Sequence, residues 1–359
     1  MRLLQLNVEN FRNIAFASVD LGAESTFLLG SNGQGKSNLL EAAGLITAVR
    51  SFRTTETRAM IRQGEAQGRL LYHVKHEQRG ECEVELALAS GSKTIMLDQE
   101  TIGRLADFIG LFPAIPLSSE DIQLLRGSPS LRRRALDLML AATDPEYFRT
   151  LSRYHQALKD RNKLLKDSAP AENRRPFERL LAAEAVKLNR ARQIGIQQVS
   201  EALVECYQVL CGIDEQPALH YKMDSPAEDE TAYLAMLVQN SPRDEAIGST
   251  QRGPHRDDLV FRLKGKPARE YASDGQQRGL VVAFRLAQLR YFQSCTQIAP
   301  VVLADDVLGE LDPKRRDGFW QAVGNDLQVI ATGTEPPVGD ARQWRIIKVE
   351  SGTFEPLAR

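Results

Sequence analysis

The sequence is poor in cysteine and aromatic residues, and it contains no long hydrophobic run. Its 359 residues include four cysteines, which lack the paired spacing of a zinc site and are too sparse for a disulfide scaffold. We therefore expect a reducing, cytoplasmic compartment. No run of about 18 apolar residues occurs, and no long apolar signal segment lies near the N-terminus. Neither secretion nor membrane insertion is expected.

The chain also lacks a large net charge. Its formal net charge of −1 argues against a uniformly basic nucleic-acid binder but leaves local patches open. Residues 131–195 contain 15 Lys and Arg against 8 Asp and Glu, so this stretch carries +7 and the remainder −8. With 42% hydrophobic residues, the chain can bury a large core. We expect either one elaborate domain or a core domain with an insertion.

A glycine-rich motif near the N-terminus carries the clearest chemical signal. Residues 30–37 read GSNGQGKS and match the phosphate-loop pattern GxxxxGK(S/T). The motif follows an apolar run at residues 26–29 and opens a helical pattern over residues 38–49. Its glycines let backbone N–H groups turn inward, and a helix N-terminus favours phosphate. The alternative, a glycine-rich surface turn, does not account for this strand–loop–helix context.

The motif assigns roles to individual side chains. Lys36 is expected to reach the outer phosphates, and the Ser37 hydroxyl to ligate Mg²⁺. The motif therefore predicts a bound nucleotide with Mg²⁺ as cofactor. The residues expected to bind the nucleotide, which the family resemblance given below implies to be ATP, are Gly30, Ser31, Asn32, Gly33, Gln34, Gly35, Lys36, Ser37 and Asn38.

A second motif, VVLADD, occupies residues 301–306. Its apolar residues predict a buried parallel strand, and its acidic pair follows at the carboxyl end, where open α/β sheets place ligands. This is the Walker B pattern. It predicts Asp305 as a Mg²⁺ ligand and Asp306 as the group that orients or deprotonates the attacking water. The alternative is a strand that ends in a solvated acidic turn.

A third motif, SDGQQ, stands at residues 273–277 before a helical run. Serine and glycine at a helix N-terminus form an anion site. In ABC-type ATPases, which this arrangement resembles, such a site is presented by a second copy of the head, so that two ATP molecules lie between two protomers. A simple helix N-cap is the alternative. The residues expected to act on the partner's nucleotide are Ser273, Asp274, Gly275 and Gln276.

The segment after the acidic pair resembles the D-loop of ABC heads, with Glu310 and Asp312 as its candidate residues. Asp312 also suits the N-cap of a helix over residues 313–323, with Pro313 at the first helical position. Both interpretations can hold together.

The pattern along the chain predicts the organisation of the fold. Strand-like runs occur at residues 2–8, 14–21 and 26–29, and those at 69–75, 82–89 and 93–97 predict an antiparallel β subdomain. Residues 119–212 are helical in pattern, with interruptions near residues 168–170 and at Pro176. Strand-like runs at residues 218–223 and 259–263 return the chain to a sheet. We therefore predict an α/β fold, with an ABC-type ATPase head of residues 1–118 and 213–359 and an inserted helical arm of residues 119–212.

The chain as a whole resembles the RecF family of bacterial recombination-mediator ATPases, whose head is related to those of SMC-type proteins. The resemblance rests on the three motifs together with NFRN at residues 10–13, RSFR at 50–53, residues 127–137 with their triple arginine, and GPHRDD at 253–258. It implies an ATP-dependent homodimer on double-stranded, gapped or junction DNA, a weak DNA-stimulated ATPase, and assistance in recombinase loading during DNA repair and replication. It further implies recombination-mediator proteins as partners, a nucleoid-associated place in the cytoplasm, and no membrane.

The basic helical stretch is the candidate DNA contact, because binding through phosphates does not require a basic chain overall. A solvated helix face is the alternative. The candidate DNA-binding residues are Arg132, Arg133, Arg134, Arg153, Lys159, Arg161 and Lys163.

The chain departs from transporter ATPases in two respects. Asp306 stands where transporter subunits usually carry Glu, and residues 331–334 read ATGT where a switch His would be expected, so the γ-phosphate sensor is unassigned. No residue is assigned to the Q-loop glutamine. Two other functions stay open: the ATP-binding subunit of a membrane transporter, and a non-hydrolysing module gated by ATP. His255 is assigned no catalytic role, since a contact to nucleotide or partner and a structural role are equally open.

Overall fold

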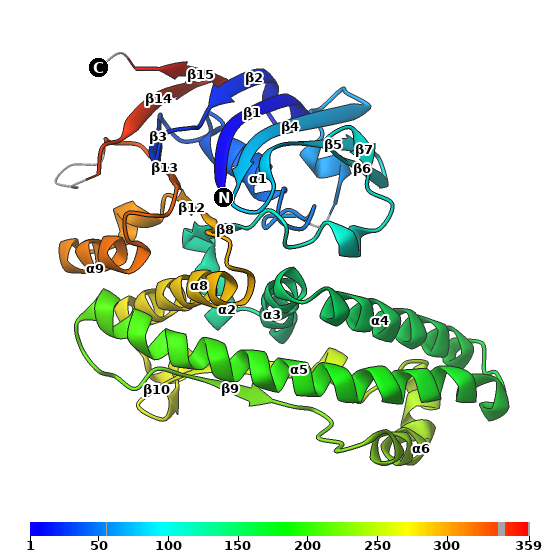
Figure 1. The fold of residues 1–359 in the computed structure, drawn as a ribbon. Coiled ribbons are helices and arrows are strands. Elements are labelled where there is room, and N and C mark those ends of the chain that lie inside the picture. The colour runs from blue at the N-terminus through cyan, green and yellow to red at the C-terminus, as the bar shows by residue number, and fades with distance from the viewer. Residues whose placement is uncertain (55, 337–341, 358–359) are drawn as a thin grey trace. The chain divides into compact units, whose positions relative to one another are not determined.

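The computed structural model describes residues 1–54, 56–336 and 342–357, which form two compact units (Figure 1). Unit 1 comprises Met1–Asp121, Cys206–Ile213 and Val282–Arg359, and unit 2 comprises Ile122–Glu205 and Asp214–Val281. The sequence pattern places residues 213–359 wholly in the head, whereas the structure groups Asp214–Val281 with the helical stretch. The physical reason is long-range pairing within unit 2, for example between Arg132 and Asp258, whose Nε and Oδ1 lie 2.7 Å apart.

Unit 1 contains a six-stranded sheet in the order β15-β14-β3-β13-β12-β8. Neighbouring strands from β14 to β8 pair in parallel, and β15 pairs antiparallel with β14. The predicted buried parallel strand before the acidic pair is confirmed. The strands are β3 (Ser25–Leu29), β8 (Ala114–Ser118), β12 (Val301–Asp305), β13 (Val329–Gly333), β14 (Arg345–Glu350) and β15 (Thr353–Pro356).

A second, antiparallel sheet of unit 1 has the order β2-β1-β4-β5-β6-β7. The alternation of buried and exposed residues along β4 and β5 shows that one face is packed and the other solvated. The predicted antiparallel β subdomain is therefore present. Its strands are β1 (Arg2–Phe11), β2 (Ile14–Asp20), β4 (Gln67–His76), β5 (Gly80–Ala89), β6 (Ser92–Leu97) and β7 (Glu100–Thr101).

The core of unit 1 joins α1 (Lys36–Gly44) to both sheets. Leu40 of α1, Leu6 of β1 and Leu303 of β12 belong to one buried cluster. The phenol of Tyr72 in β4 donates a hydrogen bond of 2.6 Å to the carbonyl oxygen of Ala42. Helix α1 begins at the phosphate loop, as predicted, but ends earlier than the pattern suggested. Helix α9 (Pro313–Val323) also belongs to unit 1 and has the predicted bounds.

Unit 2 is mainly helical and carries a small sheet in the order β11-β10-β9. The predicted interruption near residues 168–170 separates α4 from α5, but the interruption at Pro176 is wrong, because Pro176 lies inside α5. A single missing N–H bond near the start of a 41-residue helix does not break it. The elements are α2 (Gln123–Arg126), α3 (Pro129–Thr143), α4 (Pro145–Lys166), α5 (Ala171–Cys211), β9 (Ala218–Lys222), α6 (Glu230–Ile247), β10 (Asp258–Leu263), β11 (Lys266–Pro267), α7 (Ala268–Tyr271) and α8 (Asp274–Thr296). The end of α5 from Cys206 and the larger part of α8, from Val282, belong to unit 1.

Two fully buried arginines hold unit 2 together. Arg161 of α4 donates hydrogen bonds of 2.7 Å to Asp244 of α6 and to the Thr250 hydroxyl. Arg192 of α5 donates to Asp137 of α3 and to Asp257, at 2.8 and 2.9 Å. Since an unpaired buried charge is strongly unfavourable, these pairs fix the helices against the loop that leads into β10.

Candidate nucleotide site

The phosphate-loop motif lies between β3 and α1, as predicted from the sequence. Gly33 and Gly35 have φ angles of +79° and +117°, in a region that side chains disfavour. A Cβ atom on Gly30 would lie 2.4 Å from the carbonyl oxygen of Val349 in β14. The loop therefore needs glycine for its conformation at two positions and for a close backbone approach at a third.

Lys36 is folded over its own loop. Its Nζ atom donates hydrogen bonds to the carbonyl oxygens of Gly30 and Ser31, at 2.7 and 3.1 Å, and the residue is 4% exposed. The ammonium group is thus held where the motif predicts a contact with phosphate oxygens.

The structure brings the two predicted metal ligands together. The Ser37 hydroxyl at the start of α1 donates a hydrogen bond of 2.8 Å to Oδ1 of Asp305 at the end of β12. Hydroxyl and carboxylate oxygens are the donor set that Mg²⁺ prefers, so the residues present fit this ion. The two groups lie 268 residues apart in the chain and meet because β12 is two strands from β3 in the parallel sheet.

Asp305 lies in a buried, partly compensated environment. Burial raises the pKa of its carboxyl above the ordinary value, and the negative charge of Asp306 acts in the same direction. The hydrogen bonds from Ser37 and Thr332 and the positive charge of Arg53 oppose this rise. The carboxylate is therefore surrounded by donors on several sides.

Thr332, at the end of β13, is a site residue that the sequence reasoning left unassigned. Its hydroxyl donates to Oδ1 of Asp305 at 2.9 Å and accepts a hydrogen bond of 2.9 Å from the backbone N–H of Asp306. Asp306 itself has φ of +54°, an uncommon conformation for a residue other than glycine. Thr332 thus fixes both acidic residues from the neighbouring strand. Its position at the carboxyl end of a parallel strand was the signal that could have revealed it.

Gln34 connects the middle of the loop to the turn between β14 and β15. Its side-chain Oε1 accepts a hydrogen bond of 2.7 Å from the N–H of Ser351, and its carbonyl oxygen accepts one of 2.8 Å from the N–H of Gly352. The Asn13 side chain donates to the same carbonyl at 3.2 Å. The loop is therefore braced from both sides.

A buried carboxylate lies behind the loop. Glu41 of α1 is 0% exposed and accepts hydrogen bonds from Arg12, Ser51 and Arg53. These residues belong to the NFRN and RSFR stretches that carried the family resemblance. No role in the site could be assigned to them from the sequence, because no local pattern links positions so far apart.

The SDGQQ motif belongs to unit 2 and forms the start of α8. The Ser273 hydroxyl accepts a hydrogen bond of 3.4 Å from the N–H of Gln276, whose side-chain oxygen accepts one of 2.8 Å from the N–H of Ser273. This reciprocal pair is a capping box. Arg126 donates hydrogen bonds of 2.5 Å to Asp274 and 2.7 Å to Gln277. The predicted helix N-cap is thus confirmed, and contact of this motif with a partner's nucleotide stays a prediction.

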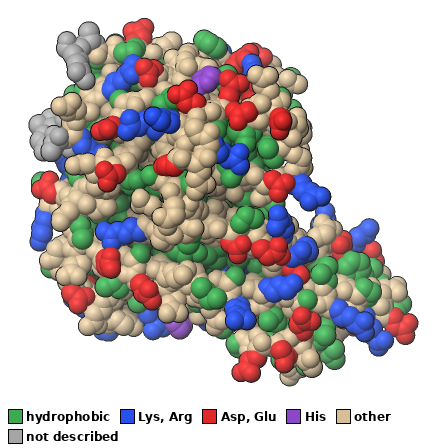
Figure 2. Space-filling view, viewed as in Figure 1, with side chains coloured by type: hydrophobic (Ala, Val, Ile, Leu, Met, Phe, Trp, Pro, Cys, Tyr) green, Lys and Arg blue, Asp and Glu red, His purple; other side chains and the backbone are tan. Residues whose placement is uncertain are grey.

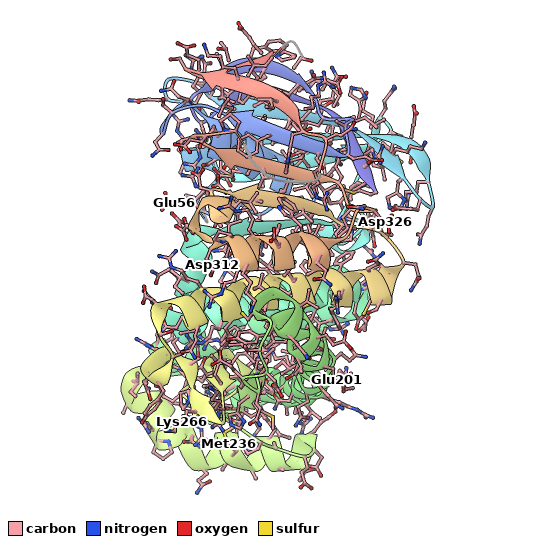
Figure 3. The ribbon with its side chains drawn as sticks, turned by 90° about the vertical axis from the view of Figure 1, so that its left-hand side faces the viewer. Glu56, Glu201, Met236, Lys266, Asp312 and Asp326 are labelled. Atoms are coloured by element: carbon pink, nitrogen blue, oxygen red, sulfur yellow. The ribbon has the colours of Figure 1, made fainter. Side chains whose placement is uncertain are left out.

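The D-loop candidates follow β12 in unit 1. Asp312 caps α9 by accepting a hydrogen bond of 3.0 Å from the N–H of Arg315, and Pro313 is the first helical residue, as predicted. Figure 3 shows Asp312 at this end of α9. Glu310 ends a short 3₁₀ turn, Val307–Glu310. Their role at a dimer seam stays a prediction.

The structure corrects two of the candidate DNA contacts. Arg161 is fully buried and paired with Asp244, and Arg132 is 7% exposed and paired with Asp258. Neither guanidinium can reach DNA without breaking an internal ion pair. Arg133 and Arg134 are half-buried, and Arg133 donates to the carbonyl oxygen of Asp257. The candidates that remain exposed are Arg153, Lys159 and Lys163.

His255 has a structural role in the described structure. Its Nδ1 lies 2.7 Å from the Tyr154 hydroxyl, and its Nε2 lies 3.1 Å from the carbonyl oxygen of Thr250. Burial lowers its pKa to about 4. A neutral imidazole that donates from Nε2 and accepts at Nδ1 satisfies both partners.

Comparison with known proteins identifies the family. The model of the RecF/RecN/SMC N-terminal domain matches residues 2–350. A protein of Rippkaea orientalis named "DNA replication and repair protein RecF" is 34% identical, and the match covers 99% of this chain and 100% of the relative. The chain belongs to the RecF family. A RecF relative from Crocosphaera subtropica is 33% identical, with 99% and 100% of the two chains covered.

Solved structures support the same fold. A structure of the recombination mediator protein RecF with ATP, described as part of the RecFOR pathway, matches with a TM-score of 0.92 at 26% identity, over 99% of this chain and 98% of the other. An Smc head bound to a domain of ScpA matches with a TM-score of 0.56 at 16% identity, over 99% and 98% of the two chains, and shows the fold alone. The predicted ABC-type ATPase head with a helical insertion is therefore confirmed.

Among the described residues, no cluster of His, Cys, Asp and Glu could by itself hold a metal ion. Nor does any helix in the described part of the chain have the length and apolar character needed to span a bilayer.

Proposed function

We propose that this protein is an ATP-dependent, DNA-binding recombination mediator. In this proposal it dimerises on ATP at gapped or stalled replication DNA, hydrolyses ATP slowly with stimulation by DNA, and assists recombinase loading together with other mediator proteins in the cytoplasm. The contact of 2.8 Å between Ser37 and Asp305 carries the proposal, because it joins the phosphate loop to the acidic strand end in one site. Membership of the RecF family supports it.

The chain's own groups suit ATP hydrolysis. Lys36 neutralises charge on the outer phosphates, and Ser37 and Asp305 would hold Mg²⁺, which stabilises the negative charge that develops on the phosphates. Asp306 orients the attacking water or accepts its proton. Thr332 holds the backbone of Asp306 and so sets the direction of this carboxylate.

The second half of each ATP site comes from a partner protomer in this proposal. The N-terminus of α8 offers the Ser273 hydroxyl and backbone N–H groups to an anion. Arg126 and the capping box hold this helix end in place from within unit 2. Closure of two protomers around two ATP molecules would therefore bring a preformed anion site to each triphosphate.

The exposed basic residues of α4 and α5 supply the DNA surface in this proposal. Lys159 and Lys163 are exposed, and so are three residues next to the break between the helices, Lys166, Arg175 and Arg179. In the described part of the chain, these five make no ion pair. Figure 2 shows Lys and Arg interspersed with carboxylates on the visible surface, in line with the low net charge. A modest patch of this kind gains affinity when dimerisation brings two copies together.

Sedimentation with and without ATP and Mg²⁺, repeated with a gapped duplex, tests the proposal. We expect a monomer without ATP, a dimer with ATP, and tighter DNA binding by the dimer. Ser273→Arg should leave ATP binding by the monomer intact and abolish the dimer. An ATP-independent dimer, or equal DNA affinity with and without ATP, would refute the nucleotide-gated mechanism.

The DNA surface has its own test. The double variant Lys159→Glu/Lys163→Glu should weaken duplex binding and should lower the salt dependence of binding by the equivalent of about two phosphate contacts per protomer. Lys75→Glu, an exposed position on β4, is the matched control and should leave binding unchanged. If the double variant and Lys75→Glu weakened DNA binding equally, the DNA contacts would lie elsewhere on the protein.

A further inference from the structure

Glu41 is a buried carboxylate that is paired with two arginines, so its single negative charge faces two positive charges. Nε of Arg12 donates to Oε2 at 3.0 Å and its Nη2 donates to Oε1 at 2.8 Å, which is a bidentate pair. The Ser51 hydroxyl donates to Oε1, and Nη1 of Arg53 lies 3.5 Å from Oε2. One carboxylate therefore faces two guanidinium groups, and the cluster keeps a net charge of +1.

The two arginines keep donors for another acceptor. Their side chains are 22% and 34% exposed, whereas Glu41 is fully buried. With partners counted among the described residues, Nη1 of Arg12 and Nε and Nη2 of Arg53 make no hydrogen bond. Each guanidinium is thus anchored at one edge by Glu41 and has free donors at another.

The cluster stands at the rim of the phosphate loop. Nη1 of Arg53 also donates a hydrogen bond of 2.8 Å to Oδ1 of Asn38, two residues after Lys36. The Asn38 side chain donates to Oδ1 of Asn13 at 2.8 Å, and Asn13 donates to the loop carbonyl of Gln34. A chain of hydrogen bonds therefore joins Glu41 to the loop.

We propose that Glu41 is a positioning residue of the ATP site, holding Arg12 and Arg53 so that their remaining N–H groups face the phosphates of ATP. This inference rests on the proposed function, because it assumes that ATP binds at the loop. Arginine suits this task because its planar fork can bind a carboxylate on one side and phosphate oxygens on another. The excess positive charge is then balanced when the nucleotide binds.

Titration of the full-length protein with MgATP by calorimetry tests the role of Glu41. Glu41→Gln keeps the shape but removes the charge and one acceptor, so both arginines lose their anchor. We expect the Kd for ATP to rise at least about tenfold, since an oriented charge-assisted contact is lost. Glu85→Gln is the matched control, because Glu85 also pairs bidentately with an arginine, Arg69, at 2.7 Å on the antiparallel sheet. The Kd of this variant for ATP should equal that of the wild type.

A double-mutant cycle separates positioning from a merely structural role. If Glu41 acts through Arg12 and Arg53, adding Glu41→Gln to a variant with both Arg12→Ala and Arg53→Ala should change the Kd much less than Glu41→Gln does alone. Fully additive losses, or a Glu41→Gln protein that melts at a lower temperature but binds ATP with the wild-type Kd, would overturn the inference. Absence of ATP binding by the wild-type protein would instead overturn the proposed function.

The arginines provide a second route if Glu41→Gln does not fold. Arg12→Gln and Arg53→Gln each keep Glu41 but remove a guanidinium that the inference places against the phosphates. Both should raise the Kd for ATP. Wild-type affinity in both variants would refute the assignment.

Discussion

His255 gives a stability prediction whose size follows from its surroundings. The imidazole bonds the Tyr154 hydroxyl and the carbonyl oxygen of Thr250, and Arg256, His155 and Asp224 are the charged groups that act on it. Its pKa falls from 6.5 in the unfolded chain to about 4 in the fold, because burial disfavours the imidazolium. The folded state therefore binds the proton less tightly than the unfolded state does. The contribution of His255 to stability is complete above pH 6.5 and is lost as the pH falls toward 4.

The expected magnitude follows from this linkage. A shift of about 2.5 units corresponds to about 3.4 kcal/mol when both states are fully protonated. Between pH 7.5 and pH 5.0, the two titration curves give a loss of about 2 kcal/mol in the free energy of unfolding. This loss comes from His255 alone and adds to whatever other groups contribute over the same range.

Urea unfolding of the wild type and of His255→Gln at both pH values measures this term. Glutamine can accept from Tyr154 and donate to Thr250 but does not titrate, so the variant should lose about 2 kcal/mol less than the wild type between pH 7.5 and 5.0. His220→Gln, at an exposed position of β9, is the control and should keep the wild-type pH response. The same loss in wild type and His255→Gln would refute the reasoning.

Three further changes test individual contacts. Thr332→Val removes the hydroxyl that bonds Asp305 and the N–H of Asp306, so single-turnover hydrolysis should slow at least about tenfold while the Kd for ATP stays within a few-fold. Gly253→Ala should destabilise by at least about 2 kcal/mol in urea unfolding, because φ is +136° and the new Cβ would lie 2.3 Å from the Tyr233 hydroxyl. Arg161→Ala should lower the free energy of unfolding by about 3–5 kcal/mol, since Asp244 would be buried without its partner. An unchanged rate in the first, or an unchanged urea midpoint in either of the others, would contradict the role assigned to that contact.

The parts of the fold that depend on local patterns could be predicted from the sequence. The phosphate loop, the strand before Asp305 and the cap at Asp312 each depend on residues close together in the chain. The contact between Ser37 and Asp305 was also predictable, because both motifs belong to a known arrangement of parallel strands.

The remaining features depend on partners that are distant in the sequence. Arg161 looked like a surface residue of a basic helix, but its acceptors lie 17, 83 and 89 residues away. The pairing of Glu41 with Arg12 likewise spans 29 residues and joins helix α1 to the turn that follows β1. Composition and periodicity do not contain this information, because they describe neighbours along the chain and not across the core.

The place of β3 in its sheet has a consequence for synthesis on the ribosome. This strand ends at Leu29, and its two neighbours, β13 and β14, begin at Val329 and Arg345. A nascent chain therefore carries an unpaired phosphate-loop strand until about 300 further residues have been translated. The phosphate loop therefore meets Asp305 and its neighbouring strands only after most of the chain has been made.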